Sequence, residues 1–107
     1  MVRTVRLPLP QQIADALAEF GSGLRDLRRR RRIPMAYAAD RAAISRSTLH
    51  KVERGDPGVG LGIYASVLAG YGMLDRLPDL VSARWDRAGL AAEGRRLPQR
   101  IRTQPGS

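Results

Sequence analysis

The segment from Met35 to Gly55 reads MAYAADRAAISRSTLHKVERG, and it decides the fold. Ser45 favours the start of a helix, because a serine side chain accepts free backbone N–H groups of the first turn. We therefore predict one helix over about 46–54, closed by Gly55, and a shorter one over about 35–42. Alanines in the shorter helix let a neighbouring helix approach closely. The segment thus predicts two short helices joined by a tight turn.

The second of these helices has two different faces. Leu49 and Val52 are three residues apart and share an apolar face with the preceding Ile44. The opposite face carries polar and basic residues, namely Arg46, Ser47, His50, Lys51 and Arg54. A helix with one anchored face and one face of donors suits the major groove of DNA, where arginine or lysine can bind guanine.

The flanking sequence predicts further helices. Apolar residues from Pro10 to Phe20 recur at helical spacing, and we expect a break or kink at Gly21-Ser22-Gly23. A helix over about 22–32 then ends in five arginines before Pro34. A further helix fits about 62–71, and its apolar stripe continues to Val81. Residues 1–8 fit either a short edge strand or a loose arm, and the pattern weakens from Asp86 onward.

Composition supports a small helical protein that binds a polyanion. The chain has 107 residues, enough for one core, with many alanines and leucines and few aromatics. It has no cysteine and one histidine, which argues against a disulfide frame and a zinc site. Codon bias explains arginine in place of lysine, but not a net charge of +9, which points to nucleic acid. The chain contains no long apolar run and no signal-peptide core, so we expect a cytoplasmic protein and no membrane partner.

Three features together resemble the Cro-like helix-turn-helix repressor family, also called the xenobiotic-response-element family. These are Ala39, the run ISRSTL at 44–49, and VERG at 52–55. The resemblance covers about Leu24 to Leu77. It implies an all-α fold, a five-helix Cro-like repressor DNA-binding domain, with an N-terminal helix extension and a basic C-terminal tail. The implied domains are 1–21 (arm and helix), 22–83 (DNA binding) and 84–107 (extension and tail).

The resemblance also implies roles for individual residues. The base-reading positions are Arg46, Ser47 and Lys51, with His50 between them on the exposed face. Backbone phosphates are expected at Thr48 and Arg54, and at the start of the first motif helix. There Met35 replaces a common polar residue, and Arg31 or Arg32 would take over its contact.

Two structural positions follow from the same resemblance. Arg28 and Glu53 match a largely buried salt bridge that joins two helices of the family. Ala43 replaces the usual turn glycine, and alanine tolerates positive φ less well than glycine does.

The C-terminal part resembles HipB-type antitoxins, through Asp86-Arg87-Ala88-Gly89 and the run LPQRIR at 97–102. This implies a repressor that binds operator DNA as a homodimer and autoregulates an operon shared with a HipA-like kinase toxin. The alternative is an interaction module that mainly neutralises such a kinase, with DNA binding secondary. The basic run 95–102 fits either a disordered arm or a contact with DNA or a partner.

We expect no enzymatic activity, because the sequence has no nucleophile–base set, metal cluster or phosphate loop. We likewise expect no cofactor and no metal.

Overall fold

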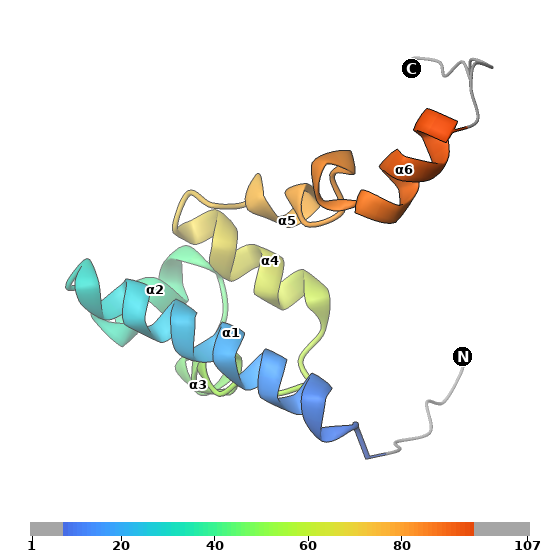
Figure 1. The fold of residues 1–107 in the computed structure, drawn as a ribbon. Helices are drawn as coiled ribbons and strands as arrows, with labels where there is room; N and C mark the ends of the chain where they lie inside the picture. The colour runs from blue at the N-terminus through green and yellow to red at the C-terminus, as the bar shows by residue number, and fades with distance from the viewer. Residues whose placement is uncertain (1–7, 96–107) are drawn as a thin grey trace, which may run out of the picture. The chain divides into compact units, whose positions relative to one another are not determined.

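The computed structural model describes residues 8–95, and all regular structure in that range is helical, which confirms the all-α prediction. The elements in chain order are α1 (Gln11–Arg30), α2 (Met35–Arg41), α3 (Arg46–Glu53), α4 (Leu61–Gly70), α5 (Arg76–Asp79), the 3₁₀ helix η1 (Ala83–Trp85) and α6 (Arg87–Arg95) (Figure 1). Two compact units divide between Leu74 and Asp75. The first contains α1 to α4, and the second contains α5, η1 and α6.

Helix α1 is continuous, so the predicted break at Gly21-Ser22-Gly23 is wrong. Gly21 is buried inside the helix, and a Cβ on it would lie 2.5 Å from the backbone nitrogen of Gly55. Its absent side chain lets α1 approach the end of α3, and the gain in packing outweighs the weak helix propensity of glycine. Ser22 is an exposed residue of the helix and caps nothing. The expected domain boundary at 21/22 therefore lies within α1.

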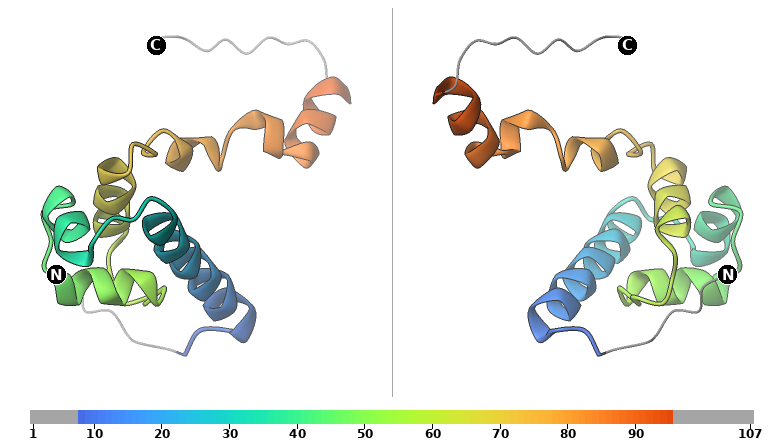
Figure 2. Two further views of the ribbon diagram at one scale, coloured as in Figure 1. Left: turned by 90° about the vertical axis from the view of Figure 1, so that its left-hand side faces the viewer. Right: turned by 90° about the vertical axis from the view of Figure 1, so that its right-hand side faces the viewer.

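The core of the first unit surrounds α3, which contacts α1, α2 and α4. Figure 2 shows these four helices from two sides. Leu49 and Val52 of α3 have 0% exposure. The other buried apolar residues come from all three neighbouring helices and their ends: Leu24, Leu27, Ala38, Ala39, Ala42, Tyr64, Val67, Leu68 and Tyr71. The residues predicted to anchor α3 are therefore the centre of the core.

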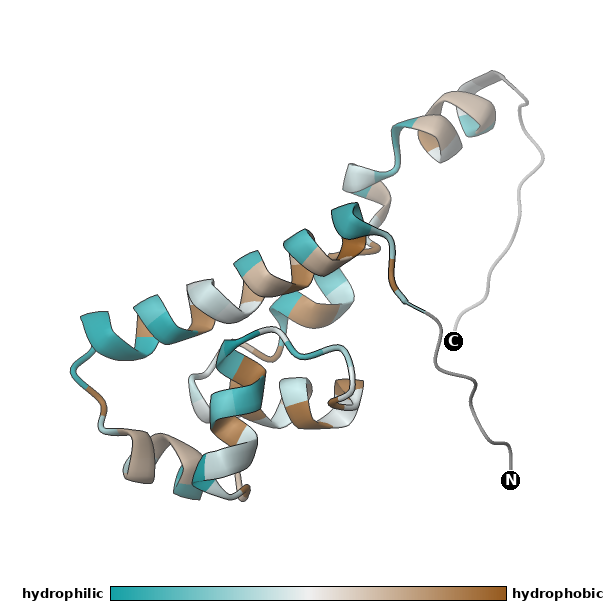
Figure 3. Ribbon diagram, turned by 90° about the horizontal axis from the view of Figure 1, so that it is seen from below, coloured by the Kyte–Doolittle hydropathy of each residue, from teal (hydrophilic) through white to brown (hydrophobic). Residues whose placement is uncertain are grey.

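The N-terminal half of α1 is less buried than its apolar spacing predicts. Hydrophobic residues recur along α1 in Figure 3, yet Ile13 is 47% exposed and Phe20 is 41% exposed. Phe20 packs one side against Tyr64, with ring centroids 5.8 Å apart. Only the half of α1 that begins at Gly21 contributes buried residues to the core.

In the second unit, helix α6 was not predicted from the sequence. It begins after Asp86, whose side chain accepts the backbone N–H of Gly89 at 2.9 Å. This is an N-cap contact of the kind that starts a helix, and Ala88, Ala91 and Ala92 favour the helix that follows. Pro78 lies in the first turn of α5, where proline is tolerated.

The residues that the structure describes in the second unit include none that is buried. Arg84 pairs with Asp79, and the Trp85 indole N–H also donates to Asp79, at 3.3 Å. Large apolar side chains remain exposed around this contact: Leu80 at 70%, Val81 at 85% and Trp85 at 64%. The expected N-terminal strand or arm (1–8) and the basic run 95–102 lie almost entirely outside the described residues.

No helix in the described range is both long and apolar enough to span a bilayer.

Candidate nucleic-acid interface

The turn between α2 and α3 is fixed by backbone hydrogen bonds at the end of α2. The Ile44 N–H donates to the Ala39 carbonyl and the Ala43 N–H to the Asp40 carbonyl, each at 3.0 Å. This pair of bonds requires a left-handed residue between helix and turn, and Ala43 takes that position with φ of +58°. Alanine therefore occupies the turn position at which the family resemblance implies a glycine.

Ser45 starts α3 as predicted. Its side-chain oxygen accepts the Thr48 backbone N–H at 3.1 Å, and its hydroxyl donates to the Thr48 hydroxyl at 2.9 Å. Two hydrogen bonds thus hold the first turn of α3. These bonds connect Ser45 to Thr48 and fix where the helix begins relative to the turn.

Helix α3 presents a polar face to solvent. The residues on this face are Arg46, Ser47, His50, Lys51 and the following Arg54, and all five are exposed. Leu49 and Val52 anchor the opposite face in the core. Because the anchored face is fully buried, the exposed face has a fixed orientation on the domain.

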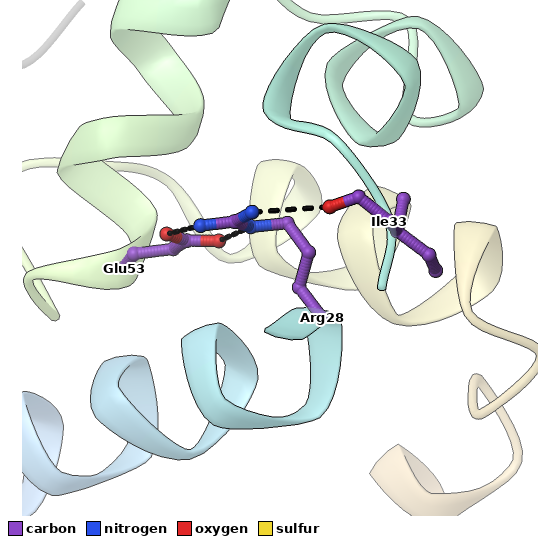
Figure 4. Close-up of polar contacts among 3 residues, drawn as sticks. All are labelled: Arg28, Ile33 and Glu53. Carbon is purple, nitrogen blue, oxygen red and sulfur yellow. Dashed lines mark hydrogen bonds and ion pairs between the residues drawn. The ribbon is translucent and has the colours of Figure 1, made fainter. Parts of the chain in front are cut away.

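A salt bridge between Arg28 and Glu53 braces α1 against α3 (Figure 4). The Arg28 Nε–H donates to Glu53 at 2.8 Å and an Nη2–H donates to the second carboxylate oxygen at 3.2 Å. A third donor, Nη1–H, reaches the Ile33 carbonyl at 3.1 Å. The side chains are only 12% and 5% exposed. The hydrogen bonds that Arg28 donates to Glu53 raise the pKa of Arg28, against the opposing effect of burial.

This two-helix arrangement agrees with a comparison of the sequence with known families. Residues 19–80 match the family described as helix-turn-helix domain. The chain belongs to the helix-turn-helix domain family. No curated protein and no solved structure matches it. Membership supports a DNA-binding regulator.

Within the helix-turn-helix domain, the residues expected at phosphates do not form one group. Arg31 donates to the Tyr71 carbonyl at 3.0 Å, and its guanidinium lies 6.0 Å from the Tyr71 ring centroid. Arg31 is thus engaged with the end of α4. Arg32 is exposed, with φ of +55° in the loop before α2. Met35, by contrast, lines a surface pocket together with Arg54.

That pocket includes residues that the sequence analysis missed. It has a volume of about 250 Å³ and lies between α1, the start of α2 and α3. Its lining residues are Arg25, Arg28, Arg29, Met35, His50, Glu53 and Arg54. Arg25 and Arg29 are new here, although their i, i+4 spacing already places them on one side of α1. Their proximity in sequence to Arg28, which was expected to pair with Glu53, is the signal that could have located them.

Proposed function

We propose that this protein is a sequence-specific transcriptional repressor of the Cro-like type. Helix α3 would enter the major groove, with Arg46, Ser47 and Lys51 reading base edges. The observation that carries the proposal is the exposed polar face of α3 opposite the fully buried Leu49 and Val52. A rigidly anchored helix can hold its donors in one register against the bases, as direct readout requires.

Backbone phosphates would supply most of the affinity. The proposed contacts are Arg31, Arg32, the start of α2 at Met35, Thr48 and Arg54. The chain carries a net charge of +9, which favours DNA through release of bound cations. We expect the affinity for any DNA sequence to fall steeply as salt rises. The base-reading residues should add a smaller contribution to the affinity that depends on the DNA sequence.

The proposed binding unit is a homodimer on a palindromic operator in the cytoplasm. Two copies of α3 would occupy successive major grooves, about 34 Å apart. The exposed apolar residues Leu80, Val81 and Trp85 support a protein contact in the second unit, since surfaces of this kind are unusual on monomers.

We further propose that the protein is a HipB-type antitoxin that represses its own operon. The resemblance at Asp86-Arg87-Ala88-Gly89 and at 97–102 supports this role. The second candidate is an interaction module that mainly holds a HipA-like kinase, and the same exposed apolar residues favour it. Co-purification with the product of an adjacent kinase gene would favour the module. Arg46→Ala should then leave binding to that kinase unchanged.

The test of the repressor is a binding titration with the protein's own promoter region and a random duplex of equal length. Arg46→Ala is expected to weaken promoter binding about tenfold or more and random binding far less, because it removes base contacts. Arg32→Ala, the matched charge change, is expected to weaken both duplexes alike. A wild-type protein without preference for any promoter sequence would contradict the proposal. Equal losses on both duplexes after Arg46→Ala would contradict the base-reading role.

A further inference from the structure

The pocket between α1 and α3 gathers positive charge from two helices. Arg25 and Arg29 are four residues apart on α1, and His50 of α3 is four residues before Arg54, the C-cap of that helix. Residues at this spacing lie on one side of a helix. All four are exposed and line the same pocket of about 250 Å³. One pair therefore lines the pocket from α1 and the other from α3 and its C-terminal end.

The pocket's single carboxylate does not neutralise this charge. Glu53 is held by two donors of Arg28, whose third donor is bound to the Ile33 carbonyl. Within residues 8–95, no other ion pair involves a lining residue. Counting the lining residues, four arginines minus Glu53 leave a formal charge of +3 with His50 neutral. Gathering like charges is unfavourable, which argues that the pocket binds an anion.

We propose that this pocket holds one DNA backbone phosphate beside the groove that α3 enters. Arg25, Arg29 and Arg54 would supply the charge, and a ring N–H of His50 would donate to a phosphate oxygen. The Arg28–Glu53 pair forms the inner wall and keeps the carboxylate away from the anion. The inference rests on the proposed DNA binding, and it assigns His50 to a phosphate where the sequence predicted a base reader.

The lining of the pocket separates two sets of residues on α3. His50 and Arg54 line it, whereas Arg46, Ser47 and Lys51 do not. The first set would therefore fix the position of α3 on the backbone, and the second would read bases. Positioning contacts carry no sequence information, so substitutions in the first set should weaken promoter and random DNA alike.

The experiment compares two neighbouring arginines of α1 in the full chain. Arg29 lines the pocket and Arg30 does not, although both are exposed cations at the same helix end. Binding to the promoter duplex and to a random duplex is measured by fluorescence anisotropy between 50 and 200 mM salt. For Arg29→Ala we expect the salt-induced loss of affinity to shrink about 3.5-fold on both duplexes, corresponding to one phosphate at a slope near 0.9. For Arg30→Ala we expect the wild-type salt dependence.

A second variant tests the opposite side of the pocket. His50→Ala should weaken both duplexes by a similar factor and leave the preference for promoter DNA unchanged. Loss of that preference would place His50 at a base and overturn its assignment. Thermal melting of each variant verifies that the fold is retained.

The outcomes separate the pocket from the proposed function. Promoter preference in the wild type tests the repressor, whereas the Arg29 and Arg30 salt dependences test the pocket. Equal salt dependences for the two variants would overturn the pocket assignment even if promoter preference is intact. The pocket would be reassigned to a small anion by two results together. Inorganic phosphate would raise the melting temperature of wild type but not of Arg29→Ala, and the salt dependence of DNA binding would be the same in both proteins. A protein that binds no DNA would overturn both proposals.

Discussion

Gly21 of α1 and Gly55 after α3 bring two backbones into direct contact. A Cβ on Gly21 would lie 2.5 Å from the Gly55 nitrogen and 2.6 Å from the Val52 carbonyl oxygen. Gly55 itself has φ of +70°, and a side chain there would meet the Leu17 carbonyl. The two glycines thus set how closely the proposed recognition helix sits against α1.

Substitution of Gly21 is therefore expected to destabilise the domain although alanine favours helices. Gly21→Ala should lower the free energy of unfolding by about 1–3 kcal/mol, because the methyl group overlaps rigid backbone atoms. Gly23→Ala is the matched control, since nothing lies within 4 Å of its Cβ position. It should raise the stability by about 0.5–1 kcal/mol. Urea denaturation measures both values, and a stabilised Gly21→Ala protein would contradict the close approach.

Breaking the Arg28–Glu53 pair should be costly. Arg28→Met is expected to reduce the free energy of unfolding by about 3 kcal/mol, because it leaves the buried Glu53 carboxylate without its partner. Combining it with Glu53→Leu should recover most of the loss in a double-mutant cycle. As a comparison, Arg84→Ala removes the more exposed pair with Asp79 and should cost less than about 1 kcal/mol. Additive losses in the double variant would show that the two side chains do not depend on each other.

Ala43 is a site where a substitution should stabilise the motif. Ala43→Gly removes the strain of φ at +58° and is expected to raise the free energy of unfolding by about 0.5–1 kcal/mol. The same change at Ala36, an exposed residue within α2, should lower the free energy of unfolding by about 1 kcal/mol, because glycine has a weak helix propensity. Chemical denaturation of the two variants gives the comparison. Destabilisation at both positions would rule out a strained turn.

Two buried tyrosines should respond oppositely to the loss of their hydroxyl groups. The Tyr64 hydroxyl donates to the Asp56 carbonyl at 2.8 Å, so Tyr64→Phe should cost about 1 kcal/mol. The buried Tyr71 hydroxyl has no hydrogen-bond partner among the described residues, so Tyr71→Phe should stabilise the protein by about 1 kcal/mol. Thermal melting distinguishes them, and a destabilised Tyr71→Phe protein would indicate an unrecognised partner.

The same tyrosines predict a loss of stability at alkaline pH. Burial raises the pKa of both, helped by the charge of Asp56 at Tyr64 and of Glu53 at Tyr71. A raised pKa means that the folded state holds the proton more tightly than the unfolded state, where tyrosine titrates near pH 10. Their contribution is thus complete below about pH 10 and is lost as the pH rises above it. The double variant Tyr64→Phe, Tyr71→Phe should show a smaller decline between pH 9 and 11.

Local sequence predicted the motif because its signals are short-range. The hydroxyl of Ser45, the spacing of Leu49 and Val52 and the glycine at position 55 each act within one helical turn. These residues form the cap, the anchor and the helix end in the structure. The Arg28–Glu53 contact spans 25 residues, and it was expected from the family resemblance, not from any local pattern.

The errors in the sequence prediction have two origins. Gly21 signals a helix break locally, but its role depends on the backbone of α3, which is distant in the sequence. Helix α6 was missed for a different reason, because the cap at Asp86 was not recognised. Arg25 and Arg29 were not predicted as site residues, since the pattern of α1 alone does not tell which of its faces meets α3.

By itself, the sequence determined an all-α protein, the capped helix α3 and its division into an anchored and a polar face. Those features depend on hydrogen bonds and side-chain periodicity within a few residues. Only the tertiary structure decided that α1 runs unbroken past Gly21 and that Arg25 and Arg29 share a pocket with His50 and Arg54. Both follow from the close packing of α1 on α3, because contact between distant segments determines which local preference prevails.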